Sequence, residues 1–289
     1  MFSLGVILMT EPFRAAELVQ VVRSIETLGY DSIWLPELFG REPIATAGYL
    51  LANTERIAIA TGIANVYSRD AVAMAQARQT LAECSDGRFM LGLGVSNAGV
   101  NSRRGHSWQP PLVKMTAFLD ALAAAQVDSP VPLRPAPIHI AAHGPALQSL
   151  AAKRSDGVIT FLMPAEHARQ SRARIGAAPA LSVVVPFLAE QDPTVARAKA
   201  RAALAVYMPL DYYRREWRKL GFADADFANG GSDRLIDTLV AWGDADALRE
   251  RVTAFSRAGA TRVIVNPLGL TAKKTGLNRH VLEQLAAAN

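Results

Sequence analysis

The 289-residue chain has a single cysteine, Cys84, so an intrachain disulfide framework is excluded. One thiol fits the reducing cytosol, and we expect a cytoplasmic protein in which Cys84 packs as a small hydrophobic residue of a helix. No apolar run approaches the ~20 residues that a bilayer-spanning helix needs, so no membrane partner is expected. The segment 1–9 lacks the basic start and the cleavage site of a signal peptide, and its pattern favours a first strand.

The signatures of several chemistries are also missing. The sequence contains no HExxH motif, paired CxxC motif, P-loop or GxSxG elbow, and its five histidines are scattered, so no metal site is predicted. The net charge of +5 does not come from a basic cluster, because Lys and Arg are interspersed with Asp and Glu along the chain. This pattern argues against a nucleic-acid partner, although a modest basic excess helps to attract an anionic small molecule.

Eight short, nearly continuous apolar runs are spread along the chain. Each is bounded by turn residues, which is typical of strands in a parallel sheet that is covered on both faces. The predicted strands span residues 3–8, 32–35, 56–61, 88–93, 137–142, 157–161, 181–187 and 262–266.

Segments with apolar residues at spacings of three and four separate these strands and predict helices. In the first, Leu18, Val22 and Ile25 share one face. The alternation favours a (β/α)8 TIM barrel over an open doubly wound sheet. We expect one domain over residues 1–289, with a helical insertion at about 209–242 before the last helix–strand unit. Helices are predicted at 14–28, 71–84, 112–126, 147–154, 165–175, 193–207 and 245–258, with a closing helix after Thr271.

The segment 87–97 is the most informative stretch of the chain. A short apolar run leads into Gly92 and Gly94, which leave bare backbone where something flat or anionic can approach closely. A dinucleotide-binding fingerprint would need glycine at position 97, where Asn97 stands, and no helix pattern opens directly behind it. The segment therefore predicts the end of a barrel strand that faces a cofactor.

Polar side chains follow several of the predicted strands, and a barrel carries its chemistry at these carboxyl ends. Each candidate also has a structural alternative. Glu37 can pair with Arg41, Arg69 and Asp70 can pair and cap the next helix, His143 can be a hydrogen-bonded loop residue, and His106 can face solvent.

Several linked motifs resemble the bacterial-luciferase-like superfamily and, within it, the F420-dependent oxidoreductases. The resemblance covers nearly the whole chain. It rests on the sequence letters DSIWLPE (31–37), RIAIATGIANVYSRD (56–70), LAECSDGRFMLGLGVS (81–96), IAAHGP (140–145), AAKRSDG (151–157) and AGATRVIV (258–265).

This resemblance implies a luciferase-like barrel that holds coenzyme F420, or alternatively FMN, across its mouth. In such proteins a bulge after the third strand, often with a non-proline cis peptide, backs the ring, and it would fall here at Gly62–Ile63. The loop 142–146 would present backbone amides to a phosphate at the start of the next helix. The cofactor-binding residues implied are Gly62, Ile63, Asn65, Gly94, Val95, Ser96, Asn97, Ala142, His143, Gly144, Pro145 and Ala146.

The chain departs from many relatives at one position, because Leu38 follows Glu37 where they carry a histidine. A leucine cannot transfer a proton, so Glu37 and His106 are the predicted acid–base residues, with His143 as a further candidate. The expected activity is hydride transfer between F420 and a small organic substrate. An FMN-dependent monooxygenase and a non-catalytic F420 or metabolite carrier are the alternatives, and a homodimer is left open.

Overall fold

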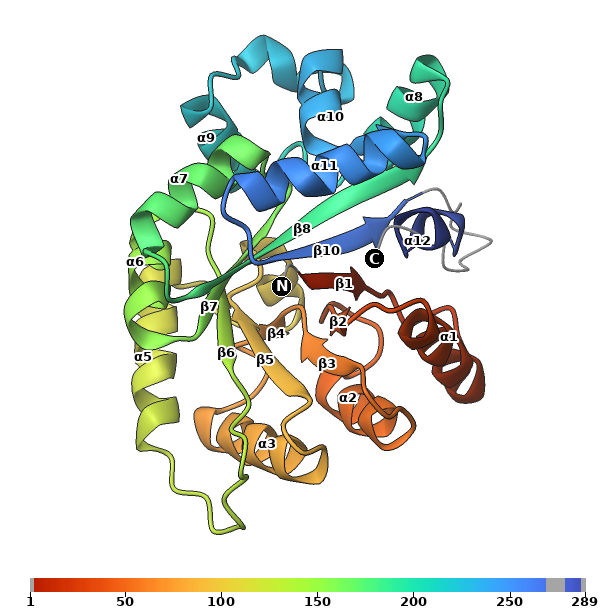
Figure 1. Ribbon diagram of the computed structural model, residues 1–289. Coiled ribbons are helices and arrows are strands. Elements are labelled where there is room, and N and C mark those ends of the chain that lie inside the picture. Colours follow the sequence, from red (N-terminus) through yellow and green to blue (C-terminus); the bar gives the residue numbers. More distant parts are fainter. Residues whose placement is uncertain (1–2, 269–278, 287–289) are drawn as a thin grey trace.

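The computed structural model describes residues 3–268 and 279–286. Eight parallel strands close into a barrel, because β10 pairs with β8 on one side and with β1 on the other. This confirms the predicted TIM barrel, and Figure 1 shows the helices around the outside of the strands. The barrel strands are β1 (Ser3–Ile7), β2 (Ser32–Leu35), β3 (Ala58–Thr61), β5 (Phe89–Gly94), β6 (Ile138–Ala141), β7 (Gly157–Phe161), β8 (Ala180–Ala189) and β10 (Arg262–Pro267).

Burial of the strands follows from their composition. All four residues of β2 and all six of β5 are buried, as expected where side chains on one face fill the barrel and those on the other meet the helices. Two short strands, β4 (Ala64–Asn65) and β9 (Ala241–Gly243), extend the ladders of β5 and β8. Sequence analysis does not predict them, because two or three residues are too few to show a period.

The helices cover the barrel through their apolar faces, and α1 buries Leu18, Val22 and Ile25 as predicted. Helix α2 is not among the predicted helices, because its sequence is apolar almost throughout and shows little amphipathic period. The helices are α1 (Ala15–Thr27), α2 (Pro43–Ala52), α3 (Ala71–Cys84), α4 (Ala98–Arg103), α5 (Pro111–Ala124), α6 (Pro145–Arg154), α7 (Ala165–Ile175), α8 (Pro193–Leu204), α9 (Asp211–Lys219), α10 (Asp233–Leu239), α11 (Ala245–Arg257) and α12 (Arg279–Ala286).

Two sequence-based expectations are wrong. A helix does open directly behind Asn97, whose side chain accepts a hydrogen bond from the Val100 N–H at 2.9 Å and so caps α4. Its six residues bury only Asn101, so no apolar pattern announces the helix. Cys84 is also not packed inside, because it is the last residue of α3 and is exposed.

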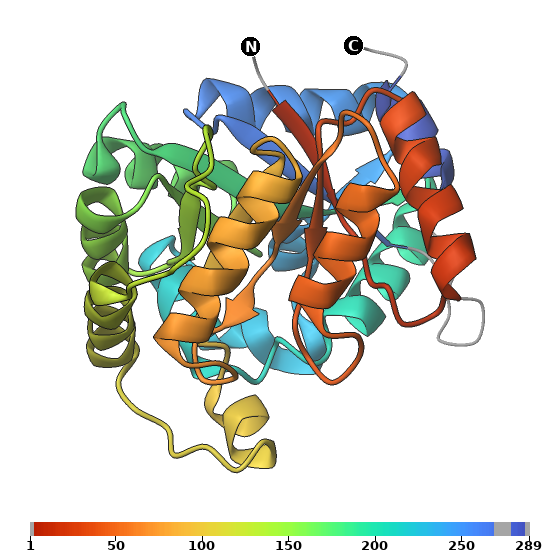
Figure 2. The same cartoon turned by 90° about the horizontal axis from the view of Figure 1, so that it is seen from below.

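The predicted insertion is present as α9, a 3-10 helix (Asp224–Gly230) and α10, all between α8 and β9. These helices share a hydrophobic cluster around Trp217 with α8, β8 and the residues just after β7. The Trp217 indole N–H donates to the Leu162 carbonyl at 2.9 Å. Figure 2 shows the α9–α10 segment and α4 at the end of the barrel toward which the arrows of β1 and β3 point. The insertion therefore covers the carboxyl ends of the strands.

The closing helix expected after Thr271 is seen as α12, while 269–278 and 287–289 lie outside the described residues. Among the helices of the described part, none is long and apolar enough to cross a membrane. The same residues contain no group of three or more His, Cys, Asp or Glu placed to hold a metal ion.

Candidate active site

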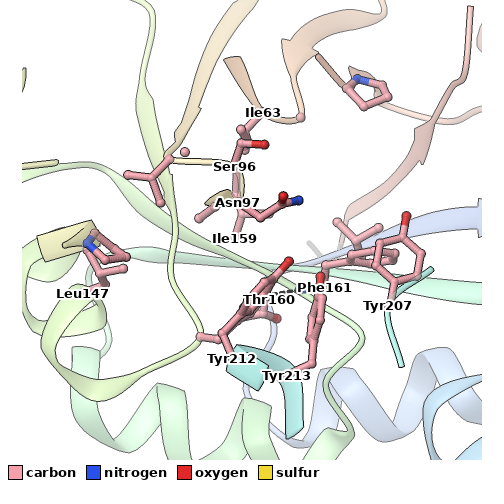
Figure 3. Close-up of a pocket in the computed structure, with 18 of the residues that line it drawn as sticks. Ile63, Ser96, Asn97, Leu147, Ile159, Thr160, Phe161, Tyr207, Tyr212 and Tyr213 are labelled. Atoms are coloured by element: carbon pink, nitrogen blue, oxygen red, sulfur yellow. Dashed lines mark hydrogen bonds between the residues drawn. The ribbon is translucent and has the colours of Figure 1, made fainter. Parts of the chain in front are cut away.

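A cavity of about 360 Å³ lies at the carboxyl ends of the barrel strands, beneath the insertion. Its volume falls in the range of small-molecule sites, roughly 300–1,000 Å³, and Figure 3 shows part of its lining. The predicted site residues that line it are Glu37, Gly62, Ile63, Gly94, Val95, Ser96, Asn97, His143 and Gly144. Asn65, Ala142, Pro145, Ala146 and His106 are predicted site residues outside this lining.

The ends of β3 and β5 and the residues just after them form an apolar wall of the cavity. The Gly62–Ile63 peptide bond is cis, which confirms the irregular backbone expected there, and Ile63 lies between β3 and β4. A Cβ atom on Gly94 would stand only 2.6 Å from the Ile63 side chain, so glycine allows Ile63 to approach β5 closely. Gly92 serves a different purpose, because the group that approaches it is the backbone of Thr61.

Glu37 stands at the end of β2 as a buried carboxylate with two arginine partners. Its Oε2 atom accepts hydrogen bonds from Arg69 Nη1 and from the Asn65 backbone N–H, both at 2.9 Å. Its Oε1 atom lies 3.2 Å from Arg104 Nη1. Arg41 is not its partner, contrary to the structural alternative considered from the sequence, because that guanidinium donates to the Thr10 and Phe13 carbonyls.

The arginines decide the charge of Glu37. Burial alone would raise the pKa of this carboxyl, but the hydrogen bonds from Arg69 and the Asn65 N–H outweigh it and lower the pKa below its usual value. Glu37 is therefore ionised at neutral pH. Arg69 also pairs with Glu42 and not with Asp70, while Asp70 caps α3 as predicted by accepting from the Ala73 N–H at 2.8 Å.

Asn65 holds this wall together from behind. It is fully buried, its amide nitrogen donates to the Asn101 side chain at 2.9 Å, and its Oδ1 atom accepts from the Tyr67 N–H at 3.2 Å. The side chain thus joins β4 to α4. Its contact with Glu37 runs through the backbone N–H alone.

The loop after β6 leads into α6, which begins two residues earlier than predicted, with Gly144 at the N-cap and Pro145 at the first helical position. His143 accepts a hydrogen bond from the Phe161 N–H at 3.2 Å. It is therefore the hydrogen-bonded loop residue that the sequence offered as the alternative to a catalytic role. Burial, together with nearby His167, lowers the pKa of His143 to about 3, so this imidazole is neutral at physiological pH. A neutral ring whose Nε2 atom already accepts a bond is a poor proton donor at that position.

His106 follows α4 in the turn that leads to α5, outside the cavity lining. Its ring packs against Tyr67 with centroids 5.8 Å apart, and its backbone N–H donates to the Asn101 carbonyl at 2.9 Å. Trp108, two residues later, stacks on the same Tyr67 at 6.0 Å and does line the cavity. The acid–base roles of Glu37 and His106 stay predictions.

Sequence analysis did not predict the aromatic side of the cavity. Tyr207, Tyr212 and Tyr213 reach it from the insertion and the segment before it, and Phe161 ends β7. Figure 3 shows the three tyrosines together, across the cavity from Ile63, Ser96 and Asn97. The rule that functional residues of a barrel lie at the carboxyl ends of its strands does not identify residues of the insertion. The one sequence feature that could have indicated these tyrosines is that three of them fall within seven positions.

Comparison with known proteins gives a consistent result. A family model described as luciferase-like monooxygenase matches residues 1–262. The 5,10-methylenetetrahydromethanopterin reductase of Archaeoglobus fulgidus is 26% identical, with 90% of this chain and 92% of that protein covered. The F420-dependent glucose-6-phosphate dehydrogenase of Amycolatopsis mediterranei is 25% identical over 55% of this chain and 57% of its own length. A solved F420-dependent secondary alcohol dehydrogenase, in complex with an F420–acetone adduct, shares the fold with a TM-score of 0.78 at 14% identity, over 100% of this chain and 98% of that one.

Proposed function

The chain belongs to the luciferase-like monooxygenase family, and on this premise we propose that it is an oxidoreductase that transfers a hydride between coenzyme F420 and a small organic substrate. The observation that carries the proposal is the apolar wall of Ile63, Gly94 and Val95 in one cavity with Gly144, the N-cap of α6. The relative and the solved dehydrogenase whose names contain F420 support the choice of cofactor.

The residues present fit a flat ring with an anionic tail. A Cβ on Gly94 would displace Ile63 into the space above the wall, so the missing side chain keeps that space open. The start of α6 offers unpaired helical N–H groups toward an anion. Glu216 lies close to Gly144, but Lys219 neutralises it through contacts of 2.8 and 2.9 Å. Bound there, the deazaflavin would supply the hydride chemistry, while the protein orients the substrate and excludes water.

Cofactor affinity tests the proposal directly. Trp108 lines the cavity, so we expect F420 to quench tryptophan fluorescence in a saturable titration, and a Trp108→Phe protein to lose much of that signal. FMN, titrated in parallel, is expected to bind at least tenfold more weakly. A protein that binds FMN and ignores F420 would instead favour the monooxygenase alternative.

Gly144→Asp is expected to weaken F420 binding by tenfold or more while the fold is retained. Gly144 has extended backbone angles at the N-cap of α6, where aspartate is a favourable residue. Its carboxylate would occupy the amides that a phosphate needs and would repel a second anion. Gly144→Asn is the matched control, since it has the same shape without the charge. Equal affinities of the two variants for F420 would remove this loop from the phosphate site.

His106→Ala is expected to lower turnover by about 10²-fold, the lower end for a positioned proton-transfer group, with little change in F420 affinity. The side chain would reach the substrate by closure of the glycine-flanked turn that holds it. Single-turnover deazaflavin oxidation measures the effect, and His280→Ala on α12 serves as the control. A wild-type rate would leave His106 as a partner of Tyr67 only.

Three further expectations stay predictions: a cytoplasmic location, a single domain over residues 1–289 and, as an open possibility, a homodimer. Gel filtration with light scattering decides whether the protein is a homodimer.

A further inference from the structure

Four aromatic residues form one wall of the cavity, and the proposed hydride transfer assigns no role to this wall. This aromatic wall consists of Phe161, Tyr207, Tyr212 and Tyr213. Ring centroids are 5.1 Å apart between Phe161 and Tyr207, and 4.5 Å apart between Tyr212 and Tyr213. The wall lies opposite Ile63 and Ser96 in Figure 3, so the space between the two sides suits a flat ring.

The aromatic wall carries two neighbouring polar groups, the phenol hydroxyls of Tyr212 and Tyr213. The hydroxyls of Tyr212 and Tyr213 are hydrogen-bonded to each other. Tyr213 is buried and packs on Trp217 with centroids 5.4 Å apart, which fixes the pair. Burial raises the pKa of Tyr212 to about 12 and raises the pKa of Tyr213 well above its usual value, so both keep their protons at neutral pH. Only one hydroxyl can donate within the pair, so the other keeps a proton that no described residue accepts. Tyr213 is buried and Tyr212 is half-buried at the cavity, so the proton available to a ligand is that of Tyr212.

Each carboxylate that lines the cavity is paired with cations, and Arg215, the one cation of the lining among the described residues, has a side chain that is 67% exposed to water. The charged lining residues of the cavity in the described part of the chain are Glu37, Arg215 and Glu216. Glu37 is held by its arginines, and Glu216 by Lys219 and, at 3.6 Å, by Arg215. A charged substrate would have to leave water without gaining a buried partner of opposite charge, which is unfavourable.

We propose that the substrate is an uncharged, flat cyclic compound whose carbonyl oxygen accepts a hydrogen bond from Tyr212 while its ring packs on the aromatic wall. This proposal rests on the proposed function, because it places the substrate in the same cavity as the F420 ring. A carbonyl oxygen suits the site, since the available group is a donor. An anion of the same shape gains little there, because the charge of Arg215 is exposed to water and already shared with Glu216.

Binding of three small probes tests the proposal. Acetophenone, benzoate and ethylbenzene share a flat ring and differ in carrying a ketone, a carboxylate or no acceptor. In calorimetric titrations of the F420-loaded protein and of the protein alone, we expect acetophenone to bind at least tenfold more tightly than benzoate. Tyr212→Phe should weaken acetophenone about three- to tenfold and leave ethylbenzene unchanged. Tyr49→Phe, an exposed tyrosine on α2, is the matched control and should change neither.

Benzoate that binds as tightly as acetophenone, acetophenone that does not bind, or a Tyr212→Phe protein with wild-type affinity for it would each overturn the proposal. F420 titration of the same samples separates the two hypotheses. If F420 fails to bind while the preference for acetophenone persists, the proposed function fails and the substrate class stands. If F420 binds and the preference is absent, the substrate class alone is wrong.

Discussion

A Gly92→Ala protein is expected to lose about 3–5 kcal/mol of its free energy of unfolding, the sum of backbone overpacking and disrupted hydrogen bonds. A Cβ at this position would stand 2.0 Å from the Thr61 carbonyl oxygen and 3.2 Å from its carbon. Both atoms belong to backbone, so no side-chain rotation can relieve the contact. The two strands must move apart instead.

The same movement would break hydrogen bonds that replace the regular ladder. The β3–β5 register ends with Ala60 opposite Met90, and β4 resumes it with Ala64 opposite Leu93. Between these points the Thr61 hydroxyl donates to the Gly92 carbonyl at 2.7 Å, and the Gly92 N–H donates to that hydroxyl at 2.9 Å. Gly92 and Thr61 therefore hold β3 and β5 together at the point where the regular strand pairing is interrupted.

Urea unfolding at neutral pH measures the loss, with Gly94→Ala as the control. The Gly94 Cβ would meet side chains alone, the Ile63 side chain at 2.6 Å, which can turn away, and the Ala141 Cβ at 3.3 Å, so about 1–2 kcal/mol is expected there. Gly94→Ala should instead lower F420 affinity, because Ile63 would move into the cavity. A Gly92→Ala protein within 1 kcal/mol of wild type would contradict this account of the wall.

These two glycines illustrate what could be predicted from the sequence and what could not. Bare backbone at this strand end was expected to let something flat or anionic approach, but the group that approaches Gly92 is the Thr61 backbone. The sequence could not say whether the approaching group was a ligand or the chain itself, because that depends on the path of Thr61 in the neighbouring strand. The eight barrel strands were predictable, since buried parallel strands are apolar on both faces and need no knowledge of their partners.

Long-range pairing is the part that sequence patterns could not supply. Glu37 was recognised as a strand-end carboxylate, but its partners Arg69 and Arg104 stand 32 and 67 positions away. The nearby Arg41 looked the better partner because it lies four positions away, yet the turn after β2 directs it to the Thr10 and Phe13 carbonyls. The tyrosines of the insertion were missed for the same reason, since only the folded chain brings α9 over the strand ends.

The second large effect is expected for Glu37→Gln, the variant that removes the buried charge between two arginines. The Glu37 side chain is 4% exposed, while Arg69 and Arg104 are 17% and 23% exposed. Breaking a buried ion pair costs about 3–5 kcal/mol, and the partial exposure of the arginines reduces this to about 2–3 kcal/mol here. A glutamine would also turn an N–H group toward a guanidinium that can only donate.

The loss should depend on pH in a defined direction. The pKa of Glu37 is lower in the folded protein than its ordinary value of 4.5, so its contribution to stability is complete above that value. The contribution disappears as the pH falls through the folded-state pKa. The difference in unfolding free energy between wild type and Glu37→Gln should therefore be constant from pH 6 to 8 and shrink below about 4.5.

Turnover separates a proton-transfer role of Glu37 from this structural one. If Glu37 acts as an acid or base, single-turnover deazaflavin oxidation should fall by about 10²–10⁴-fold in Glu37→Gln, with F420 affinity nearly unchanged. Glu42→Gln is the matched control, because Glu42 contacts the same Arg69 but is 46% exposed, so a loss of about 1 kcal/mol or less and a wild-type rate are expected. An unstable Glu37→Gln protein that keeps its rate would show that Glu37 only holds the arginines. The proton would then have to come from the tyrosine side of the cavity or from solvent.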